Sequence, residues 1–295
     1  VLIFSKPGIR MKLRVLSDYP AIVLLFIWML GPLVATIYYS LIRYNLLNPR
    51  IKGFAGIENY EFLLTDFVFT DSIYNSIQLL GSIIGITVVL GLLISYLLDQ
   101  DLYGGRLLQL VIISPFFVMP TVSALIWKNL LMHPVNGYFT YLLSLFGLPP
   151  IDWFSDIPLG SIIIIVAWNW LPFAVLVFVT AQQSMSQEIK EASKMDGAGH
   201  IAFFFQIYLP HLGKAIGAVV MIQMIFHLNI FAEIFTTTTG GPGTQTTNLA
   251  FLVYRKALLD FDIGGASAGG IISIVFANIV AIFLLRMIAK NMNSD

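Results

Sequence analysis

Apolar residues occur in six long runs that are separated by shorter, more polar segments. A helix needs about 20 mostly apolar residues to cross the roughly 30 Å hydrocarbon core of a membrane. The six runs are long enough, and the pattern therefore predicts an all-α integral membrane protein with six transmembrane helices. The predicted spans cover residues 19–42, 73–98, 107–131, 159–180, 214–235 and 266–288. Together with their loops they predict a single transmembrane domain over residues 1–295.

The composition agrees with this pattern. Hydrophobic residues make up 58% of the 295 residues and charged residues 11%, and the mean hydropathy is +0.85. Soluble domains carry about 25% charged residues. The formal net charge is zero, so no long-range field indicates a nucleic-acid partner. The chain has no cysteine, which excludes disulfides, thiolate metal sites and cysteine nucleophiles.

The distribution of Lys and Arg predicts the orientation, because these residues are more frequent in cytoplasmic segments. With the N-terminus inside, ten basic residues fall on the inner side and six on the outer side. The inner set is Lys6, Arg10, Lys12, Arg14, Arg106, Lys190, Lys194, Lys214, Arg286 and Lys290; the outer set is Arg43, Arg50, Lys52, Lys128, Arg255 and Lys256. The pattern favours a multi-pass protein of the cell membrane with both termini in the cytoplasm, and with residues 1–18 as a cytoplasmic N-terminal segment.

The first span has an alternative interpretation as a secretory signal, which carries the same basic flank. Its apolar run exceeds 20 residues, however, and a signal core has about 7 to 15. The length favours a transmembrane helix.

The longest inner connection covers residues 182–213 and has an internal pattern of its own. Ser184 and Gln187 have the spacing of a capping box, which predicts a short helix that ends near Met195. Gly197 and Gly199 follow, and both permit a turn. Helices usually need only about 2 to 8 residues to connect, so the length indicates a structured loop.

The second half of this loop also has helical spacing. Ile201, Phe204, Phe205 and Tyr208 recur at positions i, i+3, i+4 and i+7, which predicts one apolar helix face, and Pro210 discourages continuation beyond it. The simpler interpretation is a connector whose second helix lies on the membrane surface.

The residues of this loop resemble a known family motif. Glu191-Ala192-Ser193, Asp196-Gly197-Ala198, Phe204, Ile207 and Leu209-Pro210 are similar to the EAA loop of binding-protein-dependent ABC importer permeases. Ser193 replaces the second alanine of the motif, and Phe203, Phe205 and Gln206 stand where relatives often have basic or polar residues. The stretches "NIFAEIFTTTTGGPG" and "YRKALLDFDIGGASA" resemble permeases of the carbohydrate type, which take sugars, polyols or glycerol phosphate.

The resemblance implies a multi-subunit importer. This chain would pair with a second homologous permease subunit, two ATPase subunits would dock inside, and an extracytoplasmic solute-binding protein would deliver the substrate. The coupling residues that it implies are Glu191, Ala192, Ser193, Asp196, Gly197, Ala198 and Phe204. Glu191 would face a basic residue of the ATPase, Ala192 and Gly197 would permit close approach, and Asp196 would hold the turn.

The chain itself lacks the pattern of an ATPase. Lys214 follows Gly213, but Ala215 comes next and Tyr208 stands where the first glycine of a phosphate-binding loop is required. The sequence therefore predicts that the chain is not an enzyme and binds no cofactor, and the resemblance implies that the partner ATPase subunits hold ATP and Mg.

Polar residues in the fifth predicted span are the candidates for the substrate path. Gln223, His227, Asn229 and Glu233 interrupt an apolar run, and a charge deep in a bilayer costs about 2.5 to 3.5 kcal/mol unless it is paired or hydrated. On a helical wheel they form two adjacent stripes, which predicts that they line a cavity or a subunit seam. The alternatives are hydrogen bonds between helices or, for Glu233, a position near the outer interface. Asn169, between two tryptophans, is a further candidate.

Several other residues predict features of the helices rather than chemistry. Prolines can bend spans, glycines favour close packing of helices, and the stretch 248–260 predicts a short outer helix. The prolines are Pro32, Pro115, Pro120 and Pro172, and the glycines are Gly81, Gly85, Gly91 and those at 264–270.

Two other classes of function remain as alternatives. One is an ion-gradient-driven secondary transporter of a small polar solute, which would use a buried acid such as Glu233. The scarcity of carboxylates within the spans and the large inner loop argue against it. The other is a membrane scaffold or enzyme subunit, for which the sequence contains no paired carboxylates, metal cluster or nucleophile.

Overall fold

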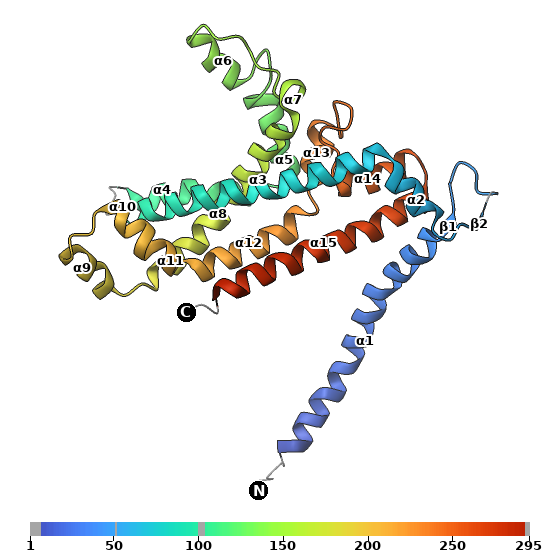
Figure 1. Ribbon diagram of the computed structural model, residues 1–295, viewed down its shortest axis with the longest axis horizontal. Helices are drawn as coiled ribbons and strands as arrows, with labels where there is room; N and C mark the ends of the chain where they lie inside the picture. The colour runs from blue at the N-terminus through green and yellow to red at the C-terminus, as the bar shows by residue number, and fades with distance from the viewer. Residues whose placement is uncertain (1–6, 51, 100–103, 293–295) are drawn as a thin grey trace. The chain divides into compact units, whose positions relative to one another are not determined.

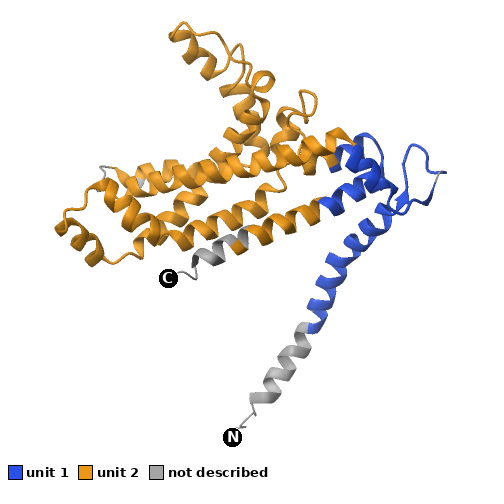
Figure 2. Cartoon of the chain, viewed as in Figure 1, with its two compact units in different colours: residues 1–65, 253–272 blue, residues 66–252, 273–295 orange. Residues whose placement is uncertain are grey.

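The computed structural model describes residues 7–50, 52–99 and 104–292, and most of them are helical (Figure 1). The chain divides into two compact units (Figure 2), of which the first contains residues 1–65 and 253–272 and the second residues 66–252 and 273–295. The single transmembrane domain expected from the sequence stays a prediction.

Four of the described helices are long and apolar enough to cross a membrane, and two bent pairs of helices bring the number to six if each pair is one span. The four lie in α1 (Pro7–Ser40), α3 (Phe67–Leu98), α8 (Pro158–Gln183) and α15 (Ile263–Met292). The predicted class, a helical multi-span membrane protein, is confirmed. Of the basic residues assigned to the inner side, Lys6 lies outside the described residues. The structure also does not describe the side chains of Arg10, Lys12, Arg14, Arg106 and Lys290.

In the first unit, a short helix is hydrogen-bonded to the end of α1 and to the strand that follows it. The strands β1 (Ile42–Arg43) and β2 (Gly53–Phe54) form a small antiparallel pair, and α2 covers Glu58–Thr65. Asn59 of α2 donates from its amide nitrogen to the carbonyl oxygens of Ser40, at 2.8 Å, and Ile42, at 2.9 Å. A Cβ at Gly264 would lie 2.5 Å from the Ile42 carbonyl oxygen, so this glycine permits the close approach expected of it.

In the second unit, α3, α8 and α12 (Gly213–His227) pack against one another (Figure 1). A Cβ on Gly91 of α3 would lie 3.0 Å from the Cβ of Ala174 and 3.2 Å from the Phe178 ring of α8, which confirms the close packing expected there. Gly81 and Gly85 lie on the exposed face of α3, where a Cβ would meet nothing within 4 Å in this chain, so the close packing expected of them stays a prediction.

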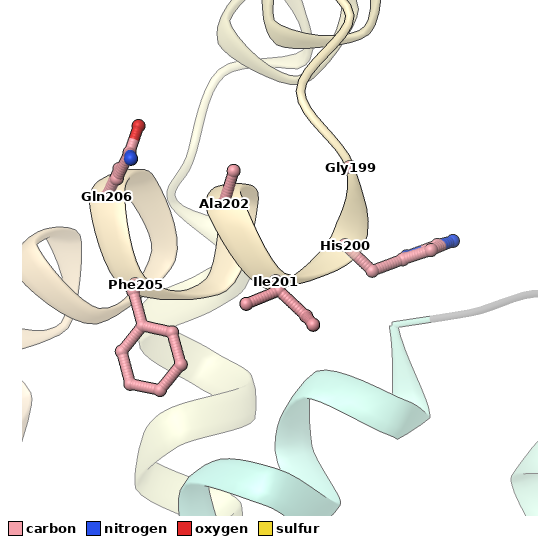
Figure 3. Close-up of a pocket in the computed structure, with 6 residues that line it drawn as sticks. All are labelled: Gly199, His200, Ile201, Ala202, Phe205 and Gln206. Carbon is pink, nitrogen blue, oxygen red and sulfur yellow. The ribbon is translucent and has the colours of Figure 1, made fainter.

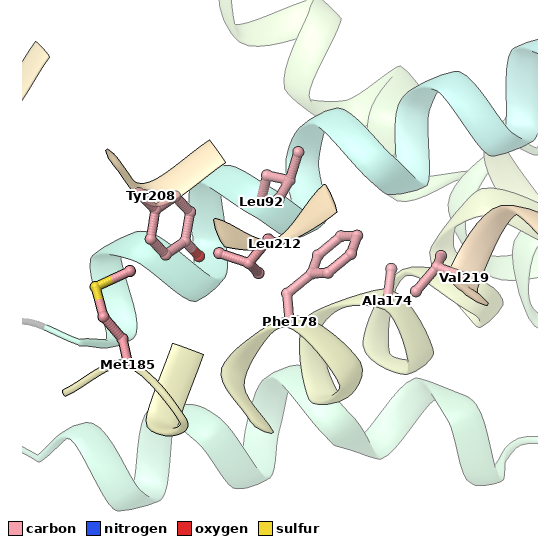
Figure 4. Close-up of a cluster of buried hydrophobic side chains, with 7 residues drawn as sticks. All are labelled: Leu92, Ala174, Phe178, Met185, Tyr208, Leu212 and Val219. Carbon is pink, nitrogen blue, oxygen red and sulfur yellow. The ribbon is translucent and has the colours of Figure 1, made fainter. Parts of the chain in front are cut away.

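A buried apolar cluster joins these three helices to the loop 182–213 (Figure 4). Leu92, Phe178 and Val219 come from α3, α8 and α12, and the loop contributes Tyr208 and others. The second half of the loop is therefore held on the helix bundle by burial of apolar surface.

The third predicted span, 107–131, is broken. It forms α4 (Gly105–Ile113), the 3₁₀ turn η1 (Ser114–Phe117), α5 (Pro120–Ile126) and the π-helical segment η2 (Trp127–Leu131), with a bend of 106°. Pro115 and Pro120 lie at the break, and neither has the N–H that would continue a helix. Pro32 and Pro172, by contrast, lie inside the continuous helices α1 and α8.

The fifth predicted span, 214–235, is not one helix either. α12 ends at His227, and α13 (Ala232–Thr237) begins after a break. The connections before α8 and after α13 contain α6 (Tyr138–Leu145), α7 (Trp153–Asp156), α14 (Leu249–Tyr254) and the π-helical η4 (Arg255–Leu259). The last two confirm the short helix expected over 248–260.

Candidate functional site

The loop 182–213 begins with α9 (Gln187–Met195), the short helix expected from the sequence. The expected capping box is wrong, however. Ser184 still belongs to the end of α8, where its hydroxyl donates to the Ala181 carbonyl oxygen at 2.6 Å. Ser186 is the residue that precedes α9 in extended conformation, with φ −64° and ψ 144°.

A Schellman turn ends α9. The Gly197 N–H donates to the Lys194 carbonyl at 3.2 Å, and the Ala198 N–H donates to the Ser193 carbonyl at 3.0 Å. Gly197 has φ +76°, a left-handed conformation that costs other L-residues about 1 to 2 kcal/mol. The turn expected here is confirmed at Gly197 and not at Gly199, whose φ is −70°. Asp196 contributes to the turn through its N–H, which donates to the Ala192 carbonyl at 2.9 Å.

One face of α9 is exposed and carries both apolar and acidic side chains. Glu188, Glu191, Ala192 and Met195 recur at i, i+3, i+4 and i+7, and Met195 is 89% exposed. We call these four residues the α9 stripe. Ser193 lies on the opposite side and is buried, and its hydroxyl donates to the Lys190 carbonyl at 2.8 Å. The α9 stripe is therefore an exposed surface with two carboxylates, one small side chain and one large apolar side chain.

The second half of the loop consists of α10 (His200–Phe203), η3 (Phe204–Tyr208) and α11 (Leu209–His211). The expected single apolar face is wrong: Tyr208 is buried and Phe204 half-buried, but Ile201 is 78% exposed and Phe205 61% exposed. The physical reason is that η3 is π-helical, with the Leu209 N–H donating to the Phe204 carbonyl. One extra residue in that turn shifts the later side chains around the helix.

Pro210 lies close to the end of this helical path, as expected. It is the second residue of α11, which ends at His211, and the path then bends by 63° at the junction with α12. Phe204 packs inward, with its ring centroid 5.4 Å from that of Tyr208.

The exposed side of this segment is hollowed. An open pocket of about 730 Å³ is lined by Gly199, His200, Ile201, Ala202, Phe205 and Gln206 (Figure 3). Figure 3 shows Ile201 and Phe205 pointing to the same side, with Ala202 and Gln206 on the other. The candidates for the substrate path are not among these lining residues.

Two of those candidates bind neighbouring helices. Gln223 is fully buried, and its side-chain oxygen accepts a hydrogen bond from the Thr87 hydroxyl of α3 at 2.6 Å. The Asn169 side-chain oxygen of α8 accepts one from the Ser123 hydroxyl of α5 at 2.8 Å. These are the hydrogen bonds between helices that the sequence left open as an alternative.

The other three candidates are placed differently from one another. His227 is buried with its ring edge-on to Trp170, at 5.0 Å between centroids, and neither ring nitrogen has a hydrogen-bond partner among the described residues. Asn229 is exposed in the break after α12, and Glu233 is buried in the first turn of α13. The helical wheel that grouped all four residues of the span is therefore wrong, because no continuous helix joins them. Their roles toward substrate stay predictions.

The sequence did not indicate two polar side chains that donate hydrogen bonds to backbone carbonyls of other segments. Lys128, counted there only as an outer charge, donates from Nζ to the carbonyl oxygens of Thr236, at 3.3 Å, and Thr237, at 2.6 Å. Asn75 of α3 donates to the carbonyl oxygens of Thr244, at 2.8 Å, and Thr247, at 2.9 Å. The only sequence signal for either was a polar residue in an apolar stretch. Within the described ranges no group of three or more His, Asp or Glu side chains could hold a metal ion.

The comparison with protein families identifies the chain. Residues 88–294 match the family of binding-protein-dependent transport system inner membrane components. The chain belongs to this family. A probable ABC transporter permease of Sinorhizobium fredii is 31% identical to it over 280 residues, which cover 94% of this chain and 90% of the relative. The chain is thus a multi-pass ABC transporter permease.

Other permeases are similar over almost the same length. The trehalose/maltose transport system permease MalF of Thermococcus litoralis is 29% identical over 86% of this permease and 87% of the relative. The sn-glycerol-3-phosphate transport system permease UgpA of Pectobacterium atrosepticum is 27% identical over 92% and 91%.

Solved structures show the same fold. A chain from the crystal structure of a bacterial ABC transporter that imports the acidic polysaccharide alginate has a TM-score of 0.78 at 20% identity, covering 95% of the permease and 99% of that chain. A second alginate transporter structure, in complex with a pentasaccharide-bound periplasmic protein, gives 0.76 at 22% identity, covering 94% of both chains.

Proposed function

We propose that this permease forms, with a second homologous permease subunit, the path through which a carbohydrate or polyol enters the cell. An extracytoplasmic binding protein delivers the solute, and two ATPase subunits, which hold ATP and Mg, drive the transport. Both termini and the loop 182–213 lie in the cytoplasm. The names of the relatives support a substrate rich in hydroxyl groups, because they include trehalose/maltose and glycerol phosphate systems.

The exposed α9 stripe is the observation that carries this proposal. The motif residues Glu191 and Ala192 lie on it, and the Schellman turn at Gly197 ends the helix that presents it. A short helix with an exposed methionine, small residues and carboxylates fits a groove with basic residues on an ATPase subunit. The ATPase draws α9 along when it closes on nucleotide, and the membrane helices move with it. Ser193 and Phe204, which face inward, support α9 and the second half of the loop rather than touching the ATPase.

Glu191 provides the test of the docking proposal. We expect Glu191→Lys to reduce co-purification of the ATPase subunit by about tenfold, because a like charge would then face the basic rim of the groove. Glu61→Lys, on α2 far along the chain from the loop, is the matched control and should leave co-purification unchanged. Normal recovery of the ATPase with Glu191→Lys would contradict the docking role.

The substrate is tested on the complete importer in proteoliposomes. A panel of sugars, polyols and glycerol phosphate is added with the binding protein, and ATP hydrolysis is measured. We expect stimulation by a solute of the hydroxyl-rich class. Solute uptake that follows an imposed ion gradient without ATP would instead support the secondary-transporter alternative, which family membership disfavours.

A further inference from the structure

The last turn of α3 contacts the loop 182–213 at three successive places. One contact is with α9, the next with the first residue of α10, and the last with the final residue of η3. The pairs are Asp99 with Lys190, at 3.0 and 2.7 Å from Nζ to the two carboxylate oxygens; Tyr96 OH with His200 Nδ1, at 3.1 Å; and Ser95 Oγ with Tyr208 OH, at 2.7 Å. The loop is thus tied to α3 along its length as well as to its neighbours in the chain.

These contacts differ in their burial and in the part of the loop that they hold. Ser95 and Tyr208 are fully buried beside the apolar cluster of Figure 4, so their hydrogen bond belongs to the packed core. Lys190 and Asp99 are partly exposed, with 22% and 30% of their side-chain surfaces accessible. Their ion pair joins α9 itself to a membrane helix, whereas the other two contacts hold the second half of the loop.

Lys190 lies on the side of α9 that faces away from the α9 stripe. At about 100° per residue, Lys190 lies about 160° around the helix from both Glu188 and Ala192. One side of α9 is therefore free for the ATPase, and the other is held by α3. Both ends of α9 are non-helical, with extended backbone at Ser186 and left-handed backbone at Gly197, so the described side-chain ion pair that holds α9 to a membrane helix is the one from Lys190.

Hydrogen bonds also hold the N-terminal part of α3 to another segment of the chain. Asp71 accepts a hydrogen bond from the Thr244 hydroxyl at 2.5 Å, Asn75 donates to the carbonyls named above, and the Ser76 hydroxyl accepts from the Leu249 N–H at 3.0 Å. These bonds hold the segment that follows α13. A continuous helix of 32 residues thus connects the loop with a segment at the other end of the unit.

We propose that Lys190 is a positioning residue for coupling, and that its ion pair with Asp99 makes α3 the helix that receives the movement of α9. This inference rests on the proposed docking of an ATPase on the α9 stripe. With the ion pair, a displacement of α9 is passed to α3 and along it. Without the pair, α9 swings about its two terminal turns and part of the displacement is lost, although the ATPase still binds and hydrolyses ATP.

The complete importer in proteoliposomes tests this inference through the number of ATP molecules hydrolysed per solute imported. We expect Lys190→Ala and Asp99→Ala each to raise this ratio about two- to fivefold, the range that a partly exposed ion pair can support. The double variant Lys190→Asp with Asp99→Lys restores the pair in reverse and should bring the ratio back toward that of the wild type. Lys194→Ala, which removes an exposed lysine from the same helix, is the control and should not change it.

Three results would overturn the inference. They are an unchanged ratio with Lys190→Ala, a reversed pair that couples no better than the single variants, and a loss of ATPase co-purification with Lys190→Ala, which would place the residue in assembly. A failure of the proposed function gives a different result, because the wild-type permease would then co-purify with no ATPase subunit. That result would overturn both the proposed function and this inference.

Discussion

Three glycines of α3 differ in what surrounds them. Gly91 faces Ala174 and Phe178 of α8, and a Cβ there is already in close contact, while Gly81 and Gly85 face open space in this chain. Glycines in membrane helices favour close approach only where a second helix is present. The same residue type thus has a packing role at one position and none within the chain at the others.

Gly91 is therefore expected to be sensitive to substitution. Gly91→Leu should destabilise the purified permease by about 1 to 3 kcal/mol, because the larger side chain forces α3 and α8 apart. Gly85→Leu is the matched control on the same helix and should change the thermal unfolding temperature little. Both are measured by thermal unfolding in detergent. Equal unfolding temperatures for the two variants would contradict the packing described for Gly91.

The short helix α9 depends for its stability on the turn that ends it. It has nine residues, fewer than an isolated helix needs in water, so its stability comes from its contacts and its terminal turn. The Schellman turn requires a left-handed residue at Gly197, and no described atom lies within 4 Å of a Cβ placed there. Within this chain, the cost of a substitution at this position is therefore set by its backbone conformation.

This allows a graded prediction for Gly197. Asn adopts the left-handed conformation more readily than other residues, and β-branched residues do so least. Gly197→Asn should retain most of the ATPase-coupled transport, and Gly197→Val should lose most of it, at equal expression. Transport is measured with the reconstituted importer. If the two variants transport equally well, the left-handed turn is not what coupling requires.

Two of the predicted spans are interrupted. Residues 107–131 and 214–235 are apolar enough to predict single helices, but the first bends by 106° around Pro115 to Pro120, and helix α12 of the second ends at His227. In the break after α12, the freed carbonyl oxygen of Ile230 accepts a hydrogen bond from the Asn248 amide at 2.6 Å. Such breaks are tolerated in membrane proteins where neighbouring segments supply the missing partners.

For the complete permease, the predicted orientation is open to a direct experiment, because the chain has no cysteine. Single cysteines can be introduced at Met195, which is 89% exposed, and at Val135, which is 73% exposed. In intact cells a membrane-impermeant thiol reagent should label Val135→Cys and leave Met195→Cys unlabelled. In inside-out vesicles stripped of ATPase subunits the labelling should reverse. Labelling of Met195→Cys in intact cells would contradict a cytoplasmic loop.

Local sequence was sufficient for the features that depend on neighbouring residues. The apolar runs predicted a helical membrane protein, since hydropathy is summed over adjacent positions. The polar spacing at the start of the loop predicted a short helix that ends near Met195, although the capping box is wrong, and Gly197 predicted the turn because glycine adopts the left-handed conformation readily. The resemblance of the same residues to the EAA loop led to the family to which the chain belongs.

Tertiary contacts decided the rest, because those features depend on residues far apart in the chain. Gln223 and Asn169 find Thr87 and Ser123 on other helices, which no helical wheel of a single span contains. The buried side of the loop's second half follows from the π-helical turn and from the cluster around Tyr208, and not from regular helical spacing. The link from α9 to α3 joins Lys190 to Asp99, 91 positions away, and only folding brings those charges together.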